Sequence, residues 1–438
     1  MIASLVHIDS LSIVIMILVG FIGSIVLAFA TRYLRYDRHY ARFLASLSGL
    51  LVSVIILSVS DHVVLFGITW TLVNGILIRL MTHFRQWPQA IESGRQAVYR
   101  LGIGTAALYL GLILVTHSAH SVRISTIIHT VPVTPMSTIG IGCIVIAALA
   151  QSAIIPFHKW LLSSLNSPTP VSALMHAGII NGGGVLLTRF GPLVIQHPTI
   201  LHFLVIIGLL TAAFGTAFKL VQSDIKRMLA CSTMGQMGFM ILQCGLGLFP
   251  AAISHMVWHG MFKAYFFLDS PSAAQYPKLS KPETPHPLSA IASIVGGMAA
   301  ASIAMMILHI SVAPINSSVV IPIVIGIAGT QGMMTFIQRN GVSLAPIGFG
   351  LAVVMGAMYG FSVRIVETTL RPLHLLAPQP FHWVHGMAAS VLIGLWASIA
   401  LSPLITKRKL PGLYVWILNL SQPHPATITS DRNMYRYD

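Results

Sequence analysis

Three ionisable residues recur every four positions in the apolar segment AAISHMVWHGMFKAYFFL, residues 251–268: His255, His259 and Lys263. In a helix, residues four apart lie on one face, about one turn from each other. Histidine changes charge near neutral pH, so a row of such groups is suited to passing protons. The structural alternative is that the three side chains form hydrogen bonds between helices, with the lysine amine reaching the nearest polar interface.

A second polar stretch interrupts the apolar pattern at QSAIIPFHKWLLSSLNSPTPVSALMHAGIINGGG, residues 151–184. Pro156 removes a backbone donor and predicts the end of the helix before it, and Pro168 and Pro170 end the short segment that follows. The next helix then carries His176 in its first turns. Broken helices in a membrane often line ion pathways, whereas the structural alternative needs only a proline kink and small residues for close packing. The predicted proton path runs through His176, His255, His259 and Lys263.

Three further charged residues are weaker candidates for the same path: Lys159, Asp224 and Lys226. Lys159 lies just after the proline break and either extends the path or anchors the chain at the interface. In SDIKR, Ser223 or Asp224 is well placed to cap the next helix, which favours structural roles for Asp224 and Lys226. His309 is isolated in the apolar region that follows, so a second charged half-channel is not expected.

The elements that carry these residues must lie in a membrane. The chain has 438 residues, of which 55% are hydrophobic and only 8% charged, and a mean hydropathy of +0.83. That is too little polar surface for a water-soluble protein of this size. Apolar windows of about 20 residues predict an all-α polytopic membrane protein with about 13 transmembrane helices and a proline-broken helix. The predicted spans are residues 11–30, 43–60, 63–81, 101–117, 138–155, 172–194, 200–221, 228–246, 249–268, 288–309, 319–337, 344–362 and 386–404.

The net charge of +15 is spread over connecting segments and does not form one basic patch, so nucleic acid is not an expected partner. The basic residues follow alternate spans, and the positive-inside rule then places the N-terminus outside and the C-terminus in the cytoplasm. Two connections depart from the rule, one with Arg123 and one with Arg364 and Arg371. The residues that obey it are Arg32, Arg35, Arg38, Arg42, Arg85, Arg95, Arg100, Lys226, Arg227, Lys278, Lys281, Lys407, Arg408 and Lys409.

The sequence gives no pattern of a catalytic or metal site. Cys143, Cys231 and Cys244 lie inside predicted spans without the spacing of metal ligands, which indicates structural thiols. The glycine run INGGGV inside a span favours helix packing over phosphate binding. The polar connections are each about 20 residues long, too short for a soluble domain. We therefore expect no enzyme activity from the chain by itself.

Four separated segments resemble the antiporter-like subunits of respiratory complex I and of Mrp sodium/proton antiporters. They are HIDSLSIVIMILVGFIGSIVLAFATRYLR, the HKWL and PTPVSALMHA stretch, LVQSDIKRMLACSTMGQMGFM, and AAISHMVWHGMFKAYFFL, in the order that the family has them. The resemblance implies the antiporter-like subunit fold. It divides the chain into an antiporter-like transmembrane core at 1–268, divergent transmembrane helices at 269–404 and a cytoplasmic tail at 405–438.

The resemblance also assigns residues of the family's ion path one by one. His176 matches the family's histidine after PTPVSAL, and His259 and Lys263 match its histidine and lysine pair. At two positions the chain differs: a glutamate of the family falls on Thr71 and a lysine of the family falls on Gln151. In the family, those two charges form the pair of the first half-channel, so their absence argues against a pumping cycle like that of complex I.

Within this superfamily, HAGIINGGGVLLTRFGPL looks most like DabB, the membrane subunit of the DAB inorganic-carbon accumulation complexes. That resemblance implies a bacterial inner-membrane protein whose partner is DabA, a large cytoplasmic zinc protein with a carbonic-anhydrase-like site. The zinc then belongs to the partner, and no cofactor is expected in this chain. The membrane subunit is expected to couple a cation gradient, of protons in preference to sodium, to the uptake of CO2 or bicarbonate.

Two other functions are compatible with the same residues. One is a proton- or sodium-translocating subunit of a complex I- or Mrp-type assembly. The other is a membrane anchor whose proton path has degenerated, which the neutral residues Thr71 and Gln151 permit. The identity of the partner proteins separates the first of these from a carbon transporter, and ion flux separates the second.

Overall fold

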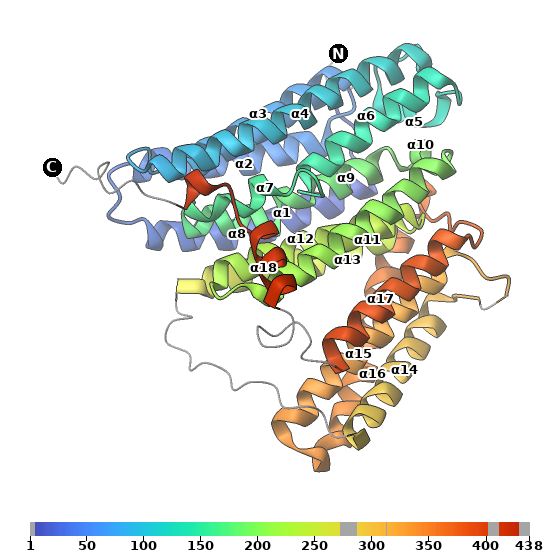
Figure 1. Cartoon of the computed structure of the whole chain (residues 1–438). Coiled ribbons are helices and arrows are strands. Elements are labelled where there is room, and N and C mark those ends of the chain that lie inside the picture. The colour runs from blue at the N-terminus through green and yellow to red at the C-terminus, as the bar shows by residue number, and fades with distance from the viewer. Residues whose placement is uncertain (1–4, 272–286, 312, 402–410, 429–438) are drawn as a thin grey trace.

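The structure is a computed structural model that describes residues 5–271, 287–311, 313–401 and 411–428, and these form an almost wholly helical protein (Figure 1). Within these ranges the extended segments make only isolated β-bridges and no β-strand. The predicted all-α membrane fold is confirmed. The α-helices are α1 (Ser10–Tyr33), α2 (Tyr40–Val59), α3 (Val63–Met81), α4 (Pro88–Ala119), α5 (Ile124–Thr130), α6 (Pro135–Gln151), α7 (Lys159–Leu162), α8 (Thr169–Ala177), α9 (Gly182–Arg189), α10 (Gly191–Ile195), α11 (Pro198–Val221), α12 (Ile225–Gly245), α13 (Phe249–Asp269), α14 (Pro287–Leu308), α15 (Val320–Asn340), α16 (Ala345–Leu370), α17 (Trp383–Leu401) and α18 (Pro411–Leu420).

Nine helices in the described part of the chain have the length and apolar composition to cross a membrane. α6 and the described part of α17 are shorter apolar helices, and α12 and α13 are long enough but contain more polar residues. Each predicted span falls on a helix or, at 172–194, on the consecutive short helices α8, α9 and α10. The main difference is at α4. Because it begins at Pro88, most of residues 82–100, expected as a polar connection, extends the helix beyond its apolar part.

The predicted break in the chain follows α6. That helix ends at Gln151, and the four-residue helix α7 and the 3-10 turn η2 (Ser164–Asn166) separate it from the start of α8 at Thr169. The Trp160 ring is buried here and donates from Nε1 to the Ala150 carbonyl at 3.0 Å. This bond ties the broken segment back to the end of α6 and satisfies a main-chain group at membrane depth.

A second interruption, which the sequence did not predict, separates α8 from α9. Ile179–Asn181 form one 3-10 turn, η3. The Asn181 side chain donates from Nδ2 to the Ala177 carbonyl at 2.7 Å, and the Ser152 hydroxyl donates to the Ile180 carbonyl at 2.8 Å. The interruption removes hydrogen bonds of the helix main chain, and polar side chains supply partners for these groups. Such partners are needed inside a membrane, where little water is present.

Glycines allow α11 and α12 to approach closely. A β-carbon built on Gly238 lies 2.4 Å from the Ala212 nitrogen and 2.7 Å from the Gly208 carbonyl oxygen. One built on Gly215 lies 2.3 Å from the Gly235 nitrogen. No side chain fits at these distances, so the contact requires glycine. The pair fixes the position of α12, which carries part of the candidate site on its face toward α13.

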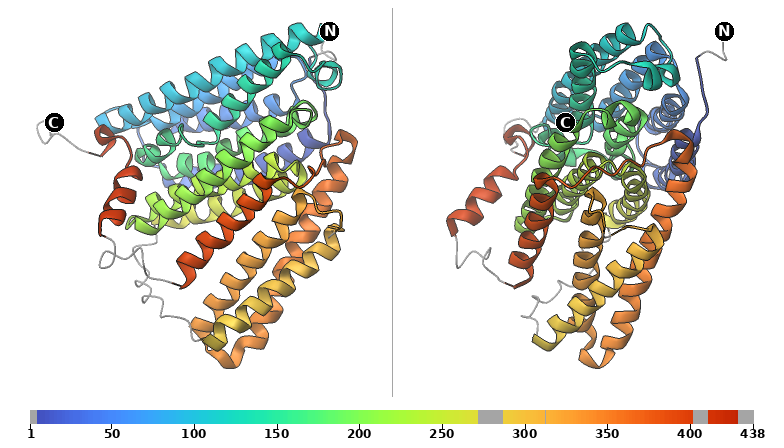
Figure 2. Two further views of the ribbon diagram at one scale, coloured as in Figure 1. Left: turned by 45° about the vertical axis from the view of Figure 1, so that its right-hand side comes forward. Right: turned by 90° about the vertical axis from the view of Figure 1, so that its right-hand side faces the viewer.

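Helices α14–α17 form a group at one side of the molecule and pack against α11, α12 and α13 (Figures 1 and 2). The contact is apolar: Val205 and Leu242 of the first group lie in one buried cluster with Ala300 and Val363 of the second. α16 also packs against α13. A residue from the C-terminal part of the chain thereby reaches the candidate site.

The segment 411–428, inside the predicted cytoplasmic tail, contains α18 and the 3-10 turn η9 (Pro425–Thr427). It packs against α11 and α4, and the Gln222 side chain donates from Nε2 to the Ser421 hydroxyl at 2.6 Å. The sequence pattern predicted no helix here. The predicted cytoplasmic residues Lys278, Lys281, Lys407, Arg408 and Lys409 lie outside the described residues.

Connections with predicted cytoplasmic arginines lie at one end of the bundle. The α1–α2 and α3–α4 connections are at that end, and α5, between α4 and α6, is at the other (Figure 1). Two arginines that depart from the positive-inside rule have carboxylate partners. Arg123 Nε lies 3.3 Å from Asp61 Oδ2, and Arg364 Nη1 lies 3.0 Å from Glu367 Oε1. These two charges are therefore balanced locally, and the orientation of the termini stays a prediction.

Candidate proton-transfer site

Three helices contribute to a hydrogen-bonded chain that ends at Lys263. His176 of α8 contacts Thr233 of α12, with 3.1 Å between the imidazole Nδ1 and the hydroxyl oxygen. The Thr233 hydroxyl donates to the Leu229 carbonyl at 2.9 Å, and Nζ of Lys263, from α13, donates to the same carbonyl at 3.0 Å. His176 and Lys263 are both fully buried. Two residues of the predicted path are thus joined through α12.

The Thr233 hydroxyl also determines which nitrogen of His176 carries the proton. Its single hydrogen is used by the Leu229 carbonyl, so its oxygen is left to accept from His176 Nδ1. Neutral His176 is then protonated at Nδ1, and the lone pair is on Nε2. That Nε2 is buried without a hydrogen-bond partner among the described residues. It is the atom at which His176 can accept a further proton.

Close packing of α8 against α13 holds His176 in place. Its imidazole stacks on the Phe267 ring, with 4.2 Å between the ring centroids and 12° between the planes. A β-carbon built on Gly260 lies 2.8 Å from the Ala177 carbonyl oxygen, so the two helices meet where α13 has no side chain. His176 is therefore fixed on both sides, by Phe267 and by Thr233.

His255, His259 and Lys263 line a cavity of about 590 Å³ between α12, α13 and α16. The rings of the two histidines are 6.1 Å apart between centroids, too far for a direct hydrogen bond. Both nitrogens of His259 and Nε2 of His255 are buried and have no partner among the described residues. A cavity of this size with unpaired polar atoms has room for water that links them. His176 does not line this cavity and reaches it only through α12.

Residues of α12 and α16 that the sequence did not indicate complete the cavity. They are Ser232 and Gln236 of α12 and Tyr359 of α16. The Tyr359 hydroxyl accepts a hydrogen bond from Nε2 of Gln243 at 3.1 Å. Ser232 and Gln236 are four residues apart, so the spacing rule that found the α13 residues applies to them too. Tyr359 lies outside the four segments on which the sequence resemblance was recognised, and its sequence context carries no such signal.

The weaker candidates lie away from this cavity. Asp224 caps α12 as expected, because its Oδ1 accepts from the Arg227 backbone N–H at 2.8 Å. Lys226 is half-buried in the first turn of α12, Lys159 is exposed, and neither lines the cavity. His309 is exposed just beyond α14. These positions support the structural alternatives for all of them.

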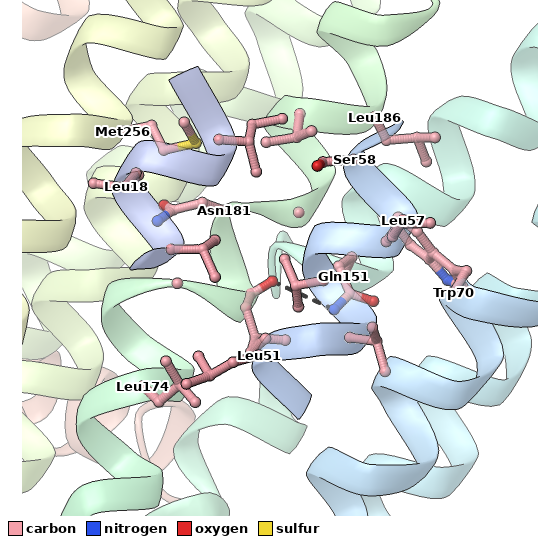
Figure 3. A pocket seen from close by; sticks show the side chains of 18 of the residues that line it. Leu18, Leu51, Leu57, Ser58, Trp70, Gln151, Leu174, Asn181, Leu186 and Met256 are labelled. Atoms are coloured by element: carbon pink, nitrogen blue, oxygen red, sulfur yellow. Dashed lines mark hydrogen bonds between the residues drawn. The ribbon is translucent and has the colours of Figure 1, made fainter. Parts of the chain in front are cut away.

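A second cavity, of about 90 Å³, lies among α1, α2, α3, α6, α9 and α13 (Figure 3). Its lining is mostly apolar and includes Leu18, Leu51 and Met256. Gln151 enters this lining from the end of α6 and donates from Nε2 to the Ile179 carbonyl at 3.4 Å. The position at which the resemblance expects a lysine thus carries an amide that bonds to the main chain.

Neutral amides face this cavity at two further points. Asn74 of α3 and Asn181 of η3 line it, and Oδ1 of each is buried without a hydrogen-bond partner among the described residues. Thr71, where the resemblance expects a glutamate, is exposed, and its hydroxyl oxygen lies 3.1 Å from that of Tyr109. The structure thus does not bring Thr71 to Gln151. The polar residue of α3 that shares the cavity with Gln151 is Asn74.

Arg189 is the charged residue that lines the second cavity. Its guanidinium pairs with Asp9, which also caps α1. It further donates to the Ser58 carbonyl at 2.6 Å and to the Ser12 hydroxyl at 3.1 Å. The Arg189 side chain thus binds both the start of α1 and the end of α2, and it holds these two helices together. Its charge is already matched by Asp9.

The described residues contain no group of three or more His, Cys, Asp or Glu side chains that could hold a metal ion. The three cysteines, Cys143, Cys231 and Cys244, are free thiols. Cys231 and Cys244 are buried among apolar side chains of α12, and Cys143 is half-buried in α6. The imidazole and amine groups that line the candidate site can exchange protons with one another through water.

Comparisons with known proteins find related membrane subunits. A family model described as "NADH:quinone oxidoreductase/Mrp antiporter, TM" matches residues 60–311, more than half of the chain. A second, described as "NADH-Ubiquinone oxidoreductase (complex I), chain 5 N-terminus", matches residues 3–44. The solved structure of the Mrp complex from Dietzia sp. matches with a TM-score of 0.64 and 21% identity, over 94% of this chain and 52% of that chain. At that identity the likeness shows the fold alone.

Two curated relatives come from Halothiobacillus neapolitanus. The probable inorganic carbon transporter subunit DabB2 is 32% identical over 386 residues, which is 85% of this chain and 69% of that protein. The probable subunit DabB1 is 35% identical over 276 residues, 61% of this chain and 49% of that protein. The chain thus spans between about half and two thirds of the length of these relatives. It belongs to the NADH:quinone oxidoreductase/Mrp antiporter family of membrane subunits and, within that family, is similar to the DabB subunits.

Proposed function

We propose that the chain is the proton-conducting membrane subunit of an inorganic carbon transporter driven by a cation gradient. Protons pass through the cavity lined by His255, His259 and Lys263, and their flow drives the uptake of CO2 or bicarbonate by a cytoplasmic partner. The observation that carries this proposal is the buried hydrogen-bonded chain from His176 through Thr233 to the carbonyl that also binds Lys263. The names of the relatives support the class of transported substrate.

Proton movement through this site needs water between the side chains. A water molecule brings the proton to an unpaired nitrogen of His255 or His259, and another passes it on to Lys263. At every transfer one N–H or O–H bond breaks as another forms, so the number of protons is conserved and the positive charge moves with the proton. Ionisable residues are costly within a membrane, which favours a functional role for this row over a merely structural one.

The second cavity, whose charged residue Arg189 is paired with Asp9, supports a different candidate function. The amides of Gln151, Asn74 and Asn181 do not titrate, so the region where the family has a charged pair offers no side chain that changes protonation. If the cavity lined by His255, His259 and Lys263 does not conduct protons either, the subunit is a membrane anchor for its partner. Proton flux distinguishes these two functions directly.

The decisive experiment is proton flux through the reconstituted complex. We expect the double variant His259→Ala, Lys263→Ala to lose at least about tenfold in proton flux and to abolish carbon-dependent growth at ambient CO2, because two titratable groups are removed from a buried path. His176→Ala is expected to reduce flux as well. His309→Ala, at an exposed histidine away from the cavity, is the control and should be near normal. Normal uptake by a well-assembled double variant leaves only the anchor function.

The partner is tested separately. We expect the chain to purify from bacterial inner membranes with a large soluble zinc protein of the DabA type bound to its cytoplasmic face. The similarity to DabB subunits motivates this expectation. Affinity purification, followed by mass spectrometry and elemental analysis for zinc, gives the answer. Recovery of quinone-reducing or Mrp-type subunits in its place contradicts the carbon-transporter assignment.

A further inference from the structure

A cavity of about 330 Å³ lies where α1 is connected to α2 and α3 to α4. Four arginines line it: Arg38 from the first connection, Arg42 from the first turn of α2, Arg79 from the last turn of α3 and Arg85 from the second connection. None of these guanidinium groups has an ion-pair or hydrogen-bond partner among the described residues. Two separate stretches of the chain therefore bring four unpaired positive charges to one cavity.

The one carboxylate that lines this cavity, Asp37, already has partners. Its Oδ1 accepts from the His39 backbone N–H at 2.7 Å, and its Oδ2 lies 3.2 Å from Nε2 of His83. Burial raises the pKa of the Asp37 carboxyl, but the His39 N–H and the contacts with His83 together hold that pKa below its ordinary value. Asp37 is thus ionised at neutral pH. Its single negative charge leaves the four arginines with an excess of positive charge.

The floor of the cavity is apolar. Phe43 and Leu80 are buried there, and the Phe43 ring meets the His83 ring edge-on with 4.9 Å between centroids. His83 in turn contacts the Phe84 ring, at 5.0 Å. The Phe43 contact joins α2 to the second connection, and the His39 ring of the first connection also meets the His83 ring, at 6.5 Å between centroids. A charged rim above an apolar floor, at the ends of two membrane-spanning helices, matches the boundary between a lipid head group and its acyl chains.

We propose that this cavity is a binding site for a phosphate-type oxyanion, from the head group of a membrane phospholipid or from free phosphate. The planar guanidinium group donates two parallel N–H bonds to such an anion, and Arg42 and Arg79 face it from two different helices. The site is distinct from the proton cavity, with which it shares no lining residue. Its occupancy does not depend on whether the subunit conducts protons.

Three probes distinguish the source of the anion. Binding to the purified chain in a neutral detergent is measured with phosphatidylglycerol, with a diacylglycerol of the same acyl chains, and with inorganic phosphate. Saturable binding of phosphatidylglycerol alone identifies the lipid head group, and binding of inorganic phosphate as well identifies a site open to free anions. Equal binding of phosphatidylglycerol and diacylglycerol overturns the proposal, because the acyl chains then account for the affinity.

Paired arginine variants test whether the cavity is the site. Arg42→Gln with Arg79→Gln is expected to weaken phosphatidylglycerol binding by at least about tenfold, since each basic residue near a head group contributes appreciably. The matched control, Arg32→Gln with Arg35→Gln, removes the same charge from the end of α1 and the first connection, outside the cavity lining. It is expected to change binding by less than about twofold. Equal losses in the two pairs point to diffuse attraction and contradict a defined site.

A second pair guards against misfolding of the glutamine variants. Arg42→Lys with Arg79→Lys keeps both charges but removes the two-pronged guanidinium geometry, so it should fold and bind phosphatidylglycerol several-fold more weakly than the parent. Binding equal to that of the parent overturns the proposed geometry. If the cavity variants instead release a co-purifying protein and keep their affinity for phosphatidylglycerol and phosphate, the cavity is a protein-docking surface and the proposal is wrong.

Discussion

Leu229 is the residue at which the main chain takes part in the candidate proton site. Its carbonyl accepts from both Thr233 and Lys263, between a group that can carry charge and the hydroxyl that orients His176. Residue type and spacing were enough to indicate His176 and Lys263. Thr233 could not be found in this way, because a helical threonine ordinarily bonds to its own i−4 carbonyl and its sequence context does not reveal a second partner.

The role of Thr233 is tested by a substitution that keeps its shape. Thr233→Val removes the hydroxyl that accepts from His176 Nδ1, so His176 loses the bond that sets its tautomer. We expect proton flux to fall at least about tenfold, while the stability falls by only about 1 kcal/mol. Thr216→Val is the matched control, since the Thr216 hydroxyl donates to its own i−4 carbonyl, that of Ala212, at 2.8 Å and has no second side-chain partner in the described ranges. Equal fluxes in the two variants contradict a positioning role for Thr233.

Lys263 is tested by keeping its charge and preventing its deprotonation. Arginine scarcely releases its proton in a protein, so Lys263→Arg should abolish proton flux about as completely as Lys263→Ala if the lysine must give up a proton. A lysine that only supplies a fixed charge, or only bonds to the Leu229 carbonyl, should largely tolerate arginine. Flux is measured in proteoliposomes with matched amounts of assembled complex. Substantial conduction by the arginine variant excludes a relay through Lys263.

At the scale of the elements, the helices and the break after α6 could be predicted from the sequence. The side-chain hydrogen bonds that stabilise the interruptions could not. Hydropathy placed each span on a helix, and Pro156 correctly marked the interruption after α6. The second interruption at η3 carries no proline and escaped prediction, because it is stabilised by Asn181 and Ser152, whose partners are set by packing. α18 was missed too, since a helix of ten residues near the end of the chain lies below the length of a membrane span.

The contact between α11 and α12 yields a prediction about helix packing. Gly238→Val places a side chain against the main chain of α11, where a β-carbon already lies 2.4 Å from the Ala212 nitrogen. Because backbone cannot yield, we expect loss of the folded protein, seen as aggregation in size-exclusion chromatography. Gly142→Val, in α6, has open space around its β-carbon and serves as the control. Normal elution of the Gly238 variant argues against this close approach.

At the scale of the whole molecule, the arrangement of charge relates the fold to its function. Span prediction and the positive-inside rule together predict a topology, with Arg123, Arg364 and Arg371 as exceptions. Asp61, 62 residues before Arg123, is the partner of that arginine, a pairing that sequence spacing does not reveal. Glu367 pairs with Arg364 one turn further along α16. The residues missed at the cavity, such as Tyr359, come from helices far apart in the sequence. Contacts between residues so far apart in the sequence depend on tertiary packing, which a local sequence pattern does not encode.

The orientation of the whole molecule is the last prediction. Single cysteines are placed in a background without the native ones: Val122→Cys, in the exposed connection before α5, and Gln86→Cys, in the exposed connection before α4. With the N-terminus outside, a membrane-impermeant thiol reagent should label the Val122 variant in intact cells and the Gln86 variant only after permeabilisation, because the unpaired arginines retain the Gln86 end in the cytoplasm.

The reverse labelling pattern means that the arginine-lined cavity faces outward, and it contradicts docking of a cytoplasmic partner at that end. Equal labelling of both variants in intact cells means that the reagent has entered the cells. A reporter that is active only in the cytoplasm, fused to the C-terminus, then measures the orientation independently.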